Sequence, residues 1–235
     1  DEDFSACIYK DKAEKVIDDI LDRNKIPIIA GGTGFYIKAL LERLDIPSIE
    51  PDNNYRFELE QLANEKGRKF LYDILYEKDP IICQKLHYND KFRVIRALEV
   101  IKTLGKPMSE LQTSSCPKYD TVYFGLNAEN RDFLYDRINK RVNIMLDLGL
   151  IDEVKYLIDN YGKTISMLKT LGYKEICQYL AGELSFEESV ELIKKNTRNF
   201  AKRQLTWFRA NPQIHWFYID KISEQEILRQ ILEVF

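Results

Sequence analysis

Basic side chains recur at helical spacing near the end of the chain. Lys194, Arg198 and Lys202 lie one helical turn apart, so an amphipathic helix would carry them on one stripe, with Ile193 and Phe208 largely on the other side. A helix that packs its apolar face and offers cations on the other suits a polyanion such as a nucleic-acid backbone. An ordinary solvated basic face is the alternative, and charge alone favours it.

Two arginines further upstream have the spacing of a phosphate clamp. Arg137 and Arg141 are related as i and i+4, so one helix would direct both side chains toward the same ligand. Guanidinium groups bind phosphate oxygens through two parallel hydrogen bonds. The alternative is a pair of surface ion pairs with Glu129, Asp132 or Asp136, which are common and contribute little.

A glycine-rich turn follows a short apolar run near the start of the chain. Lys25–Ala30 has the pattern of a buried parallel strand, Gly31–Gly34 breaks it, and Phe35–Leu41 resumes with helical spacing. Backbone N–H groups at such a turn, together with the helix dipole, can hold an anion, and the Thr33 hydroxyl can add a hydrogen bond. A tight chain reversal, with Thr33 as a helix cap, is the alternative.

The composition limits the kinds of partner. The 235 residues carry a net charge of −3, so nucleic-acid binding must use local patches such as Lys194–Arg209, which holds basic but no acidic side chains. No run of apolar residues is long enough to span a membrane, and no signal peptide is visible. Scattered cysteines without a CxxC pair argue against a zinc site or disulfide framework and fit a cytoplasmic protein: Cys7, Cys83, Cys116 and Cys177.

The elements that position these residues alternate between strands and helices. Two further strands are predicted at Thr121–Leu126 and His215–Ile219, which indicates an α/β protein with a parallel sheet. Between about Pro51 and Pro117 the pattern is entirely helical. We therefore expect residues 1–47 and 118–235 to form an α/β core, and residues 48–117 to form an inserted all-helical subdomain.

Residues that begin and end helices mark several boundaries. Asn130 is expected to cap a long helix that runs to about Leu148. Ser185 and Glu188 form a capping-box pattern at the start of the basic helix. Within the helical segment, Gly67 and Gly105 are expected to end two of the helices.

Several blocks together resemble the tRNA dimethylallyltransferases, also called tRNA isopentenyltransferases. The similarity extends over nearly the whole chain, and the blocks follow the family's order. They are GGTGFYIKALLERLDIP at Gly31–Pro47, HYNDKFRVIRALEV at His87–Val100, RDFLYDRINKRVNIMLDLGLIDEV at Arg131–Val154, LGYKEICQYLAGELSFEE at Leu171–Glu188 and TRNFAKRQLTWFR at Thr197–Arg209. The lack of a zinc finger near Phe235 is typical of the bacterial type.

This resemblance implies an activity and a fold. The family transfers a dimethylallyl group from dimethylallyl diphosphate to N6 of adenosine 37, which is 3′-adjacent to the anticodon of a tRNA. Its core is a P-loop nucleotide-kinase-like α/β fold with a parallel sheet.

The sequence departs from the family pattern at its start. The family begins with a P-loop, GxxxxGK[ST], and a nearby aspartate that acts as general base, and this chain has neither. It begins at Asp1 without an initiator Met, so we expect the N-terminal part to be missing and the chain alone to be inactive. Mg²⁺ is implied for the complete enzyme, with its ligands outside this chain.

The resemblance also implies roles for individual residues. Arg141 is implied as the catalytic contact to the diphosphate and Thr33 as a catalytic contact to the tRNA, while Gly31, Gly32 and Arg137 are implied at the diphosphate. The implied tRNA contacts are spread along the chain: Arg56, Phe92, Arg93, Arg96, Lys169, Gly172, Tyr173, Lys174, Thr197, Arg198, Lys202, Arg203 and Gln204.

For some of these residues a structural role is the alternative. Phe92 can stack on a base, but an aromatic residue at helical spacing can equally belong to the core. The loop around Gly172 can be an ordinary connection between helices. His87 and His215 have no Cys or His partner at metal-ligand spacing, so no metal site is assigned; we expect His87 to order its loop and His215 to be packed.

The implied partners are a tRNA anticodon stem-loop and dimethylallyl diphosphate, and we expect a monomer without membrane contact. Two other functions are kept open. One is an adenylate isopentenyltransferase acting on free nucleotides, which would lack the tRNA-contacting blocks. The other is a noncatalytic tRNA-binding module, which the absence of the P-loop would favour if the gene began at Asp1.

Overall fold

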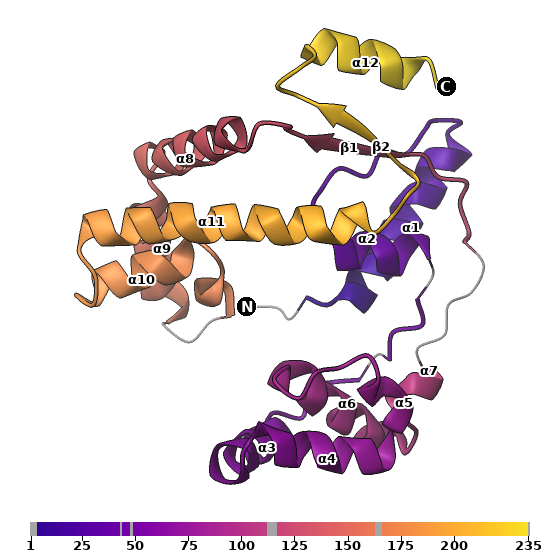
Figure 1. Ribbon diagram of the computed structural model, residues 1–235, viewed down its shortest axis with the longest axis vertical. Coiled ribbons are helices and arrows are strands. Elements are labelled where there is room, and N and C mark those ends of the chain that lie inside the picture. The colour runs from indigo at the N-terminus through magenta and orange to yellow at the C-terminus, as the bar shows by residue number, and fades with distance from the viewer. Residues whose placement is uncertain (1–3, 43, 48, 112–116, 163–165, 235) are drawn as a thin grey trace. The chain divides into compact units, whose positions relative to one another are not determined.

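The computed structural model describes residues 4–42, 44–47, 49–111, 117–162 and 166–234 (Figure 1). The chain divides into two compact units, a first unit at Phe4–Asp120 and a second unit at Thr121–Phe235. The first unit thus contains both the N-terminal residues expected in the α/β core and the expected helical insertion, residues 48–117. The assignment of residues 1–47 and 118–235 to one core stays a prediction, and its boundary residue 48 lies outside the described residues.

The first unit begins with two packed helices, α1 (Ala6–Asp22) and α2 (Gly34–Leu41). Ser5 caps α1, because its hydroxyl accepts a hydrogen bond from the Ile8 N–H at 3.3 Å. The helices meet through the stacked rings of Tyr9 and Tyr36, whose centroids are 4.9 Å apart.

The strand predicted at Lys25–Ala30 is wrong. This segment has no regular secondary structure, and the side chains of Ile26 and Ile28 are 59% and 86% exposed. A strand exists only when a neighbouring backbone completes its hydrogen-bond ladder. Among the described residues, sheet pairing joins only β1 and β2, so the apolar run remains extended and unpaired.

Short helices make up the rest of the first unit: α3 (Asn53–Lys66), α4 (Arg68–Lys78), α5 (Pro80–Cys83), α6 (Lys91–Leu104) and α7 (Met108–Leu111). They share a core of their own that includes Leu71, Leu75 and Leu98. Gly67 and Gly105 end α3 and α6 with φ angles of 89° and 66°, which confirms both predicted stops.

The second unit contains the sheet. β1 (Tyr123–Asn127) and β2 (Ile214–Tyr218) run parallel, with Gly125 opposite Trp216. Both strands lie within one or two residues of their predicted positions, so the α/β class and the parallel pairing are confirmed.

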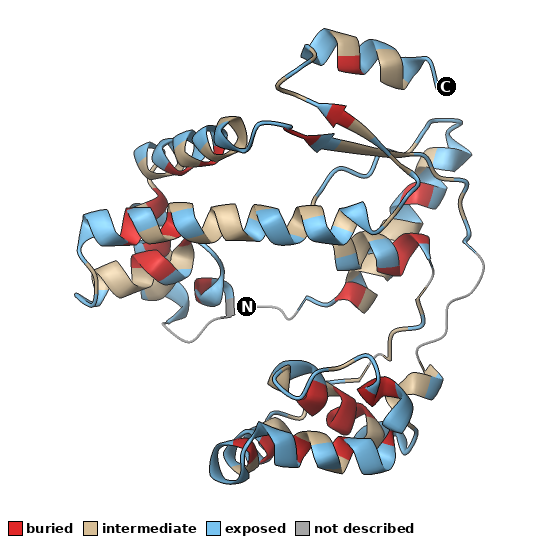
Figure 2. Cartoon of the chain, in the orientation of Figure 1, coloured by how far each residue is buried: buried red, intermediate tan, exposed pale blue. Residues whose placement is uncertain are grey.

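Helices form the rest of this unit: α8 (Arg131–Asp147), α9 (Leu150–Tyr161), the short 3₁₀ helix η1 (Ser166–Lys169), α10 (Tyr173–Leu180), α11 (Phe186–Arg209) and α12 (Glu224–Leu232). Buried residues of α8, α9, η1, α10 and α11 form one core cluster: Val142, Leu150, Val154, Leu168, Ile176, Val190 and Ile193. Figure 2 colours the buried segments of these helices red. Among the helices that the structure describes, none is long and apolar enough to cross a membrane.

Two predicted helix starts in this unit are confirmed. The Asn130 side chain accepts from the Asp132 N–H at 2.9 Å and caps α8. At the start of α11, the Ser185 hydroxyl accepts from the Glu188 N–H at 3.1 Å, and Glu188 accepts from the Ser185 N–H at 2.8 Å.

The close packing of the two strands predicts a strong effect at Gly125. A Cβ atom there would lie 2.6 Å from Cε3 of Trp216 and 2.8 Å from Cγ2 of Ile214, so the indole would have to move. We expect Gly125→Ala to lower the free energy of unfolding by about 1–3 kcal/mol, measured by urea denaturation. Leu126→Ala is the matched control, since that side chain is 62% exposed. Equal stability of the two variants would contradict the packing argument.

Candidate nucleic-acid interface

Arg137 and Arg141 lie on α8 with exposed side chains. Within the described residues, neither guanidinium forms an ion pair or a hydrogen bond; Arg137 only approaches the Phe133 ring, at 5.9 Å from its centroid. Glu129, a candidate partner in the alternative reading, is bound instead to Lys221 at 2.9 Å. The two arginines are therefore available to an anionic ligand.

Two of the three cations on the basic stripe of α11, Lys194 and Arg198, are bound to other residues, so the stripe is only partly free. Lys194 is half-buried and pairs with Glu191 at 2.8 Å. Arg198 donates from Nη1 to Oδ1 of Asn139 at 2.7 Å. The physical reason is that α8 packs beside α11 and offers Arg198 an amide acceptor, so this guanidinium serves to join the two helices.

Tyr135 of α8 completes this contact. Its ring centroid lies 6.0 Å from Cζ of Arg198 and 5.8 Å from Nζ of Lys202. Tyr135 and Asn139 face α11, whereas Arg137 and Arg141 are each two residues further along α8, a rotation of about 200°. The structure therefore places the free arginines and the α11 cations on different faces of α8.

Beyond this contact, the last turns of α11 keep accessible cations. Lys202 and Arg203 are exposed, and Arg203 lies 5.7 Å from the ring of Phe200. Phe200 itself is 42% exposed, so it does not pack into the core. The Thr197 hydroxyl donates to the Ile193 carbonyl at 2.7 Å. Gln204 is half-buried.

The loop at Lys169–Lys174 presents its two lysines to solvent. Gly172 has φ = 94°, a left-handed conformation that favours glycine. The Tyr173 hydroxyl donates to Oε1 of Glu153 at 2.6 Å, which is the main cause that raises the pKa of Tyr173 to about 12. The Tyr173 ring packs partly against the core cluster, and its role in stacking on a base stays a prediction.

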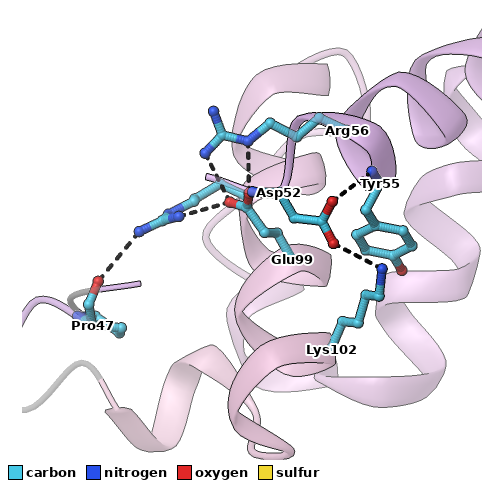
Figure 3. Close-up of polar contacts among 7 residues, drawn as sticks. Pro47, Asp52, Tyr55, Arg56, Glu99 and Lys102 are labelled. Carbon is cyan, nitrogen blue, oxygen red and sulfur yellow. Dashed lines mark hydrogen bonds and ion pairs between the residues drawn. The ribbon is translucent and has the colours of Figure 1, made fainter. Parts of the chain in front are cut away.

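In the first unit, Arg56 and Arg96 bind one buried carboxylate, that of Glu99. Figure 3 shows Arg56 and Glu99 in this contact. The Glu99 side chain is fully buried, at 0% exposure. Arg56 donates to both of its oxygens at 2.8 Å, and Nη1 of Arg96 donates to Oε2 at 2.6 Å. These two guanidiniums, predicted to contact tRNA, are therefore already bound to Glu99 and only partly exposed.

This cluster also holds the segment that leads into α3. The Asp52 N–H donates to Oε1 of Glu99 at 2.9 Å, and Nη2 of Arg96 donates to the Pro47 carbonyl at 3.2 Å. Burial alone would raise the pKa of the Glu99 carboxyl, but the hydrogen bonds from Arg56, Arg96 and the Asp52 N–H outweigh it and lower that pKa. The carboxylate therefore stays ionised at neutral pH.

Among the predicted tRNA contacts of α6, Phe92 and Arg93 are exposed, in contrast to Arg96. Phe92 is 77% exposed at the start of α6, which excludes the alternative that it is a core residue. Arg93 is also exposed, with Nε 3.4 Å from Asp90. His87 orders the preceding loop as expected, because its Nδ1 accepts from the Asn89 N–H at 3.2 Å. His215, expected to be packed, is exposed.

Thr33 precedes α2 as its N-cap residue, yet its side chain makes no capping hydrogen bond. The hydroxyl is exposed and free of partners among the described residues, so the capping alternative is not observed. Gly31 is exposed and has no atom within 4 Å of a would-be Cβ, whereas Gly32 is half-buried. Thr33 and Arg141 belong to different units, so their common site stays a prediction.

The chain matches one protein-family model, described as IPP transferase, over residues 1–211. The chain belongs to the IPP transferase family. It is 45% identical to a tRNA dimethylallyltransferase of Carboxydothermus hydrogenoformans over 97% of this chain and 74% of the relative.

Solved structures agree with the family assignment. The full-length tRNA isopentenylpyrophosphate transferase of Bacillus halodurans superposes with a TM-score of 0.67 and 38% identity over 99% of this chain and 73% of that one. A eukaryotic dimethylallyltransferase acting on tRNA gives a TM-score of 0.75 and 26% identity over 99% of this chain and 63% of that one.

Two buried carboxylates of this IPP transferase were not predicted from the sequence. Glu99 and Glu175 are both buried, at 0% and 2% exposure, and each binds donors from another segment. Their signal was present in the sequence: each is an acid next to apolar residues on a predicted helix, as in Leu98–Val100. An acid in such a position is normally buried only when donors satisfy it.

Removing Glu99 should destabilise the first unit. Glu99→Ala would leave two guanidiniums and the Asp52 N–H without their acceptor. We expect a loss of about 2–3 kcal/mol in the free energy of unfolding, below the ~3–5 kcal/mol of a fully buried pair, because water reaches part of both arginines. Urea denaturation measures it, with the exposed Glu65→Ala as control.

The same cluster predicts a pH dependence. Since the folded-state pKa of Glu99 is lowered, its contribution is present above the unfolded pKa and is lost as pH falls through the folded value. The stability difference between the natural protein and Glu99→Ala should therefore shrink in acid. A constant difference from neutral pH down to strong acid would contradict an ionised Glu99.

Proposed function

We propose that this chain carries the tRNA-binding and diphosphate-binding residues of a tRNA dimethylallyltransferase. The reaction transfers the dimethylallyl group of dimethylallyl diphosphate to N6 of adenosine 37 in a tRNA anticodon loop. The observation that carries the proposal is the 45% identity to a named tRNA dimethylallyltransferase along nearly the whole chain.

The chemistry assigns a role to the free arginines. N6 of the adenine forms a bond to C1 of the dimethylallyl group, the bond from C1 to oxygen breaks, and pyrophosphate leaves with the bonding electrons. N6 then gives up a proton to a base, which we assign to no residue of this chain. Arg141, with Arg137 one turn away, stabilises the charge that develops on the departing pyrophosphate, while Gly31 and Gly32 offer further diphosphate contacts. The guanidiniums of Arg137 and Arg141 are exposed and unpaired among the described residues, which supports this role.

The adenine must leave the anticodon-loop stack before it can react. The exposed Phe92 suits stacking on an unpaired base, and the Thr33 hydroxyl suits a hydrogen bond to the tRNA. Exposed cations suit phosphate contacts, which fix the position of the RNA: Arg93, Lys169, Lys174, Lys202 and Arg203. The occupied guanidiniums of Arg56, Arg96 and Arg198 act indirectly, by holding the elements that carry the others.

We also propose that the complete enzyme uses Mg²⁺ at the diphosphate, acts as a monomer and works in the cytoplasm. Among the residues that the structure describes, no group of three or more His, Cys, Asp or Glu side chains is arranged to hold a metal ion. The described residues therefore do not form a metal site on their own.

Mass spectrometry of an anticodon stem-loop tests the function. The RNA is incubated with dimethylallyl diphosphate and Mg²⁺, with this chain and, in parallel, with the chain extended upstream to the start of its gene. We expect the extended protein to add one dimethylallyl group to the RNA. RNA binding without modification by either protein would favour a noncatalytic binding module. Modification of free adenosine phosphates, but not of the stem-loop, would favour the nucleotide-specific relatives.

Arg141→Ala tests the diphosphate role. We expect turnover to fall by about 10²-fold or more, as when one charge-stabilising donor is removed, while the Kd for the stem-loop stays within about twofold. Arg131→Ala, an exposed arginine three turns earlier on α8, is the matched control and should change neither value. Weaker RNA binding with intact single-turnover chemistry would contradict the assignment.

Salt dependence separates direct phosphate contacts from indirect roles. Lys202→Ala should weaken all RNA substrates alike and reduce the slope of log K against log salt by about 0.7–0.9, the value for one lost phosphate contact. Arg96→Ala should lower stability without changing that slope, because its guanidinium binds Glu99 and Pro47. Equal slope changes for both variants would show that Arg96 also contacts phosphate.

A further inference from the structure

Glu175 is a buried carboxylate without a cation. Its side chain is on α10, is 2% exposed, and forms no ion pair within the described residues. Two neutral groups satisfy it: the Gly172 N–H donates to Oε2 at 2.9 Å, and Nδ2 of Asn196 donates to Oε1 at 2.7 Å. Burying a charge is costly unless hydrogen bonds replace the lost water, so this arrangement requires both donors.

The two donors belong to segments that sequence separates. Gly172 lies within the Lys169–Lys174 segment as the N-cap residue of α10, where its left-handed φ of 94° turns the chain into that helix. Asn196 lies in the middle of α11, directly before Thr197. Around the carboxylate, Ile176 and Ile193 are 0% and 1% exposed, so this junction is enclosed by apolar packing.

Both segments carry proposed RNA contacts. Lys169 and Lys174 are exposed on the loop, and Lys202 and Arg203 are exposed further along α11. Cations held at a fixed spacing lose less conformational freedom when they bind a polyanion, so the junction favours binding without touching the ligand.

We propose that Glu175 is a positioning residue that fixes the Lys169–Lys174 loop against α11, so that the cations of both segments meet the RNA as one surface. This inference rests on the proposed function and deepens it. Glu175 acts through Gly172 and Asn196 and does not contact the substrate.

Hydrogen-bond chemistry supplies a test. A carboxylate only accepts, so Asn196 must present its NH₂ group to Glu175. Asn196→Asp would oppose two carboxylates at hydrogen-bond distance. Adding Glu175→Gln would restore both bonds. The new amide oxygen accepts from the Gly172 N–H as before, and the new NH₂ group donates to the carboxylate at position 196, so donor and acceptor are exchanged in that bond alone. Rescue of this kind requires the direct contact.

The experiment measures the Kd for the anticodon stem-loop and the KM for dimethylallyl diphosphate in the full protein. We expect Asn196→Asp to weaken RNA binding about tenfold, equivalent to ~1.4 kcal/mol, with the diphosphate KM unchanged. The double variant Glu175→Gln/Asn196→Asp should return to within about threefold of the natural protein, because contacting residues do not contribute additively.

Val154→Ala controls for stability alone. Val154 is fully buried in the same core cluster but takes no part in the hydrogen bonds of Glu175 with Gly172 and Asn196. We expect this variant to melt earlier and, below its melting temperature, to bind RNA normally. RNA binding by Asn196→Asp that matches Val154→Ala, or a double variant as weak as Asn196→Asp, would overturn the proposal.

Three further cases are decisive. If Asn196→Asp does not fold, a folded double variant with normal RNA affinity supports the proposal, and a folded double variant with weak affinity overturns it. If the natural protein modifies the stem-loop while Asn196→Asp binds it normally, only the positioning role fails. If the natural protein neither binds nor modifies the stem-loop, the proposed function fails with it.

Discussion

A carboxylate buried away from water must collect hydrogen-bond donors, and this requirement organises both units of the protein. In the first unit, Glu99 gathers two arginines and the Asp52 N–H, and thereby fixes the segment between α2 and α3. In the second unit, Glu175 gathers a loop N–H and an amide of α11. Each carboxylate joins segments that apolar packing alone would leave free to slide, since hydrophobic contact has no direction.

The same requirement divides the cations of the protein into two classes. Arg56, Arg96 and Arg198 have their guanidiniums bound to other residues and contribute to the architecture. Arg137 and Arg141 keep theirs exposed and unpaired within the described residues. Composition gives both classes the same charge, but only the second can bind a phosphate without first losing an internal partner. Family resemblance alone does not draw this distinction.

Features determined by neighbouring residues could be predicted from the sequence. The caps at Asn130 and Ser185 and the glycine stops at Gly67 and Gly105 depend on a few consecutive residues, and all are observed. The two paired strands were also visible, because their β-branched and aromatic runs are bounded by turn residues.

Features that depend on distant partners could not be predicted. The Lys25–Ala30 run has the composition of a strand but no described ladder partner. Arg56 lies 43 residues from the carboxylate that occupies it, and no local pattern connects the two. Of the candidate site, the sequence located the accessible Phe92 and Arg141, but it did not reveal which of the other cations are already bound.

Two long helices, α8 and α11, connect the sheet of the second unit to its helical core (Figure 1). α8 runs from β1 toward the core cluster, and α11 runs from that cluster back to β2. The hydrogen bond from Arg198 to Asn139 joins the two helices between their ends. All three buried residues of α11 lie in its first third, Ser189, Val190 and Ile193. The remaining two thirds of α11 carry no buried residue, so polar contacts such as those of Arg198 with Asn139 and Tyr135 hold this part of the helix beside α8.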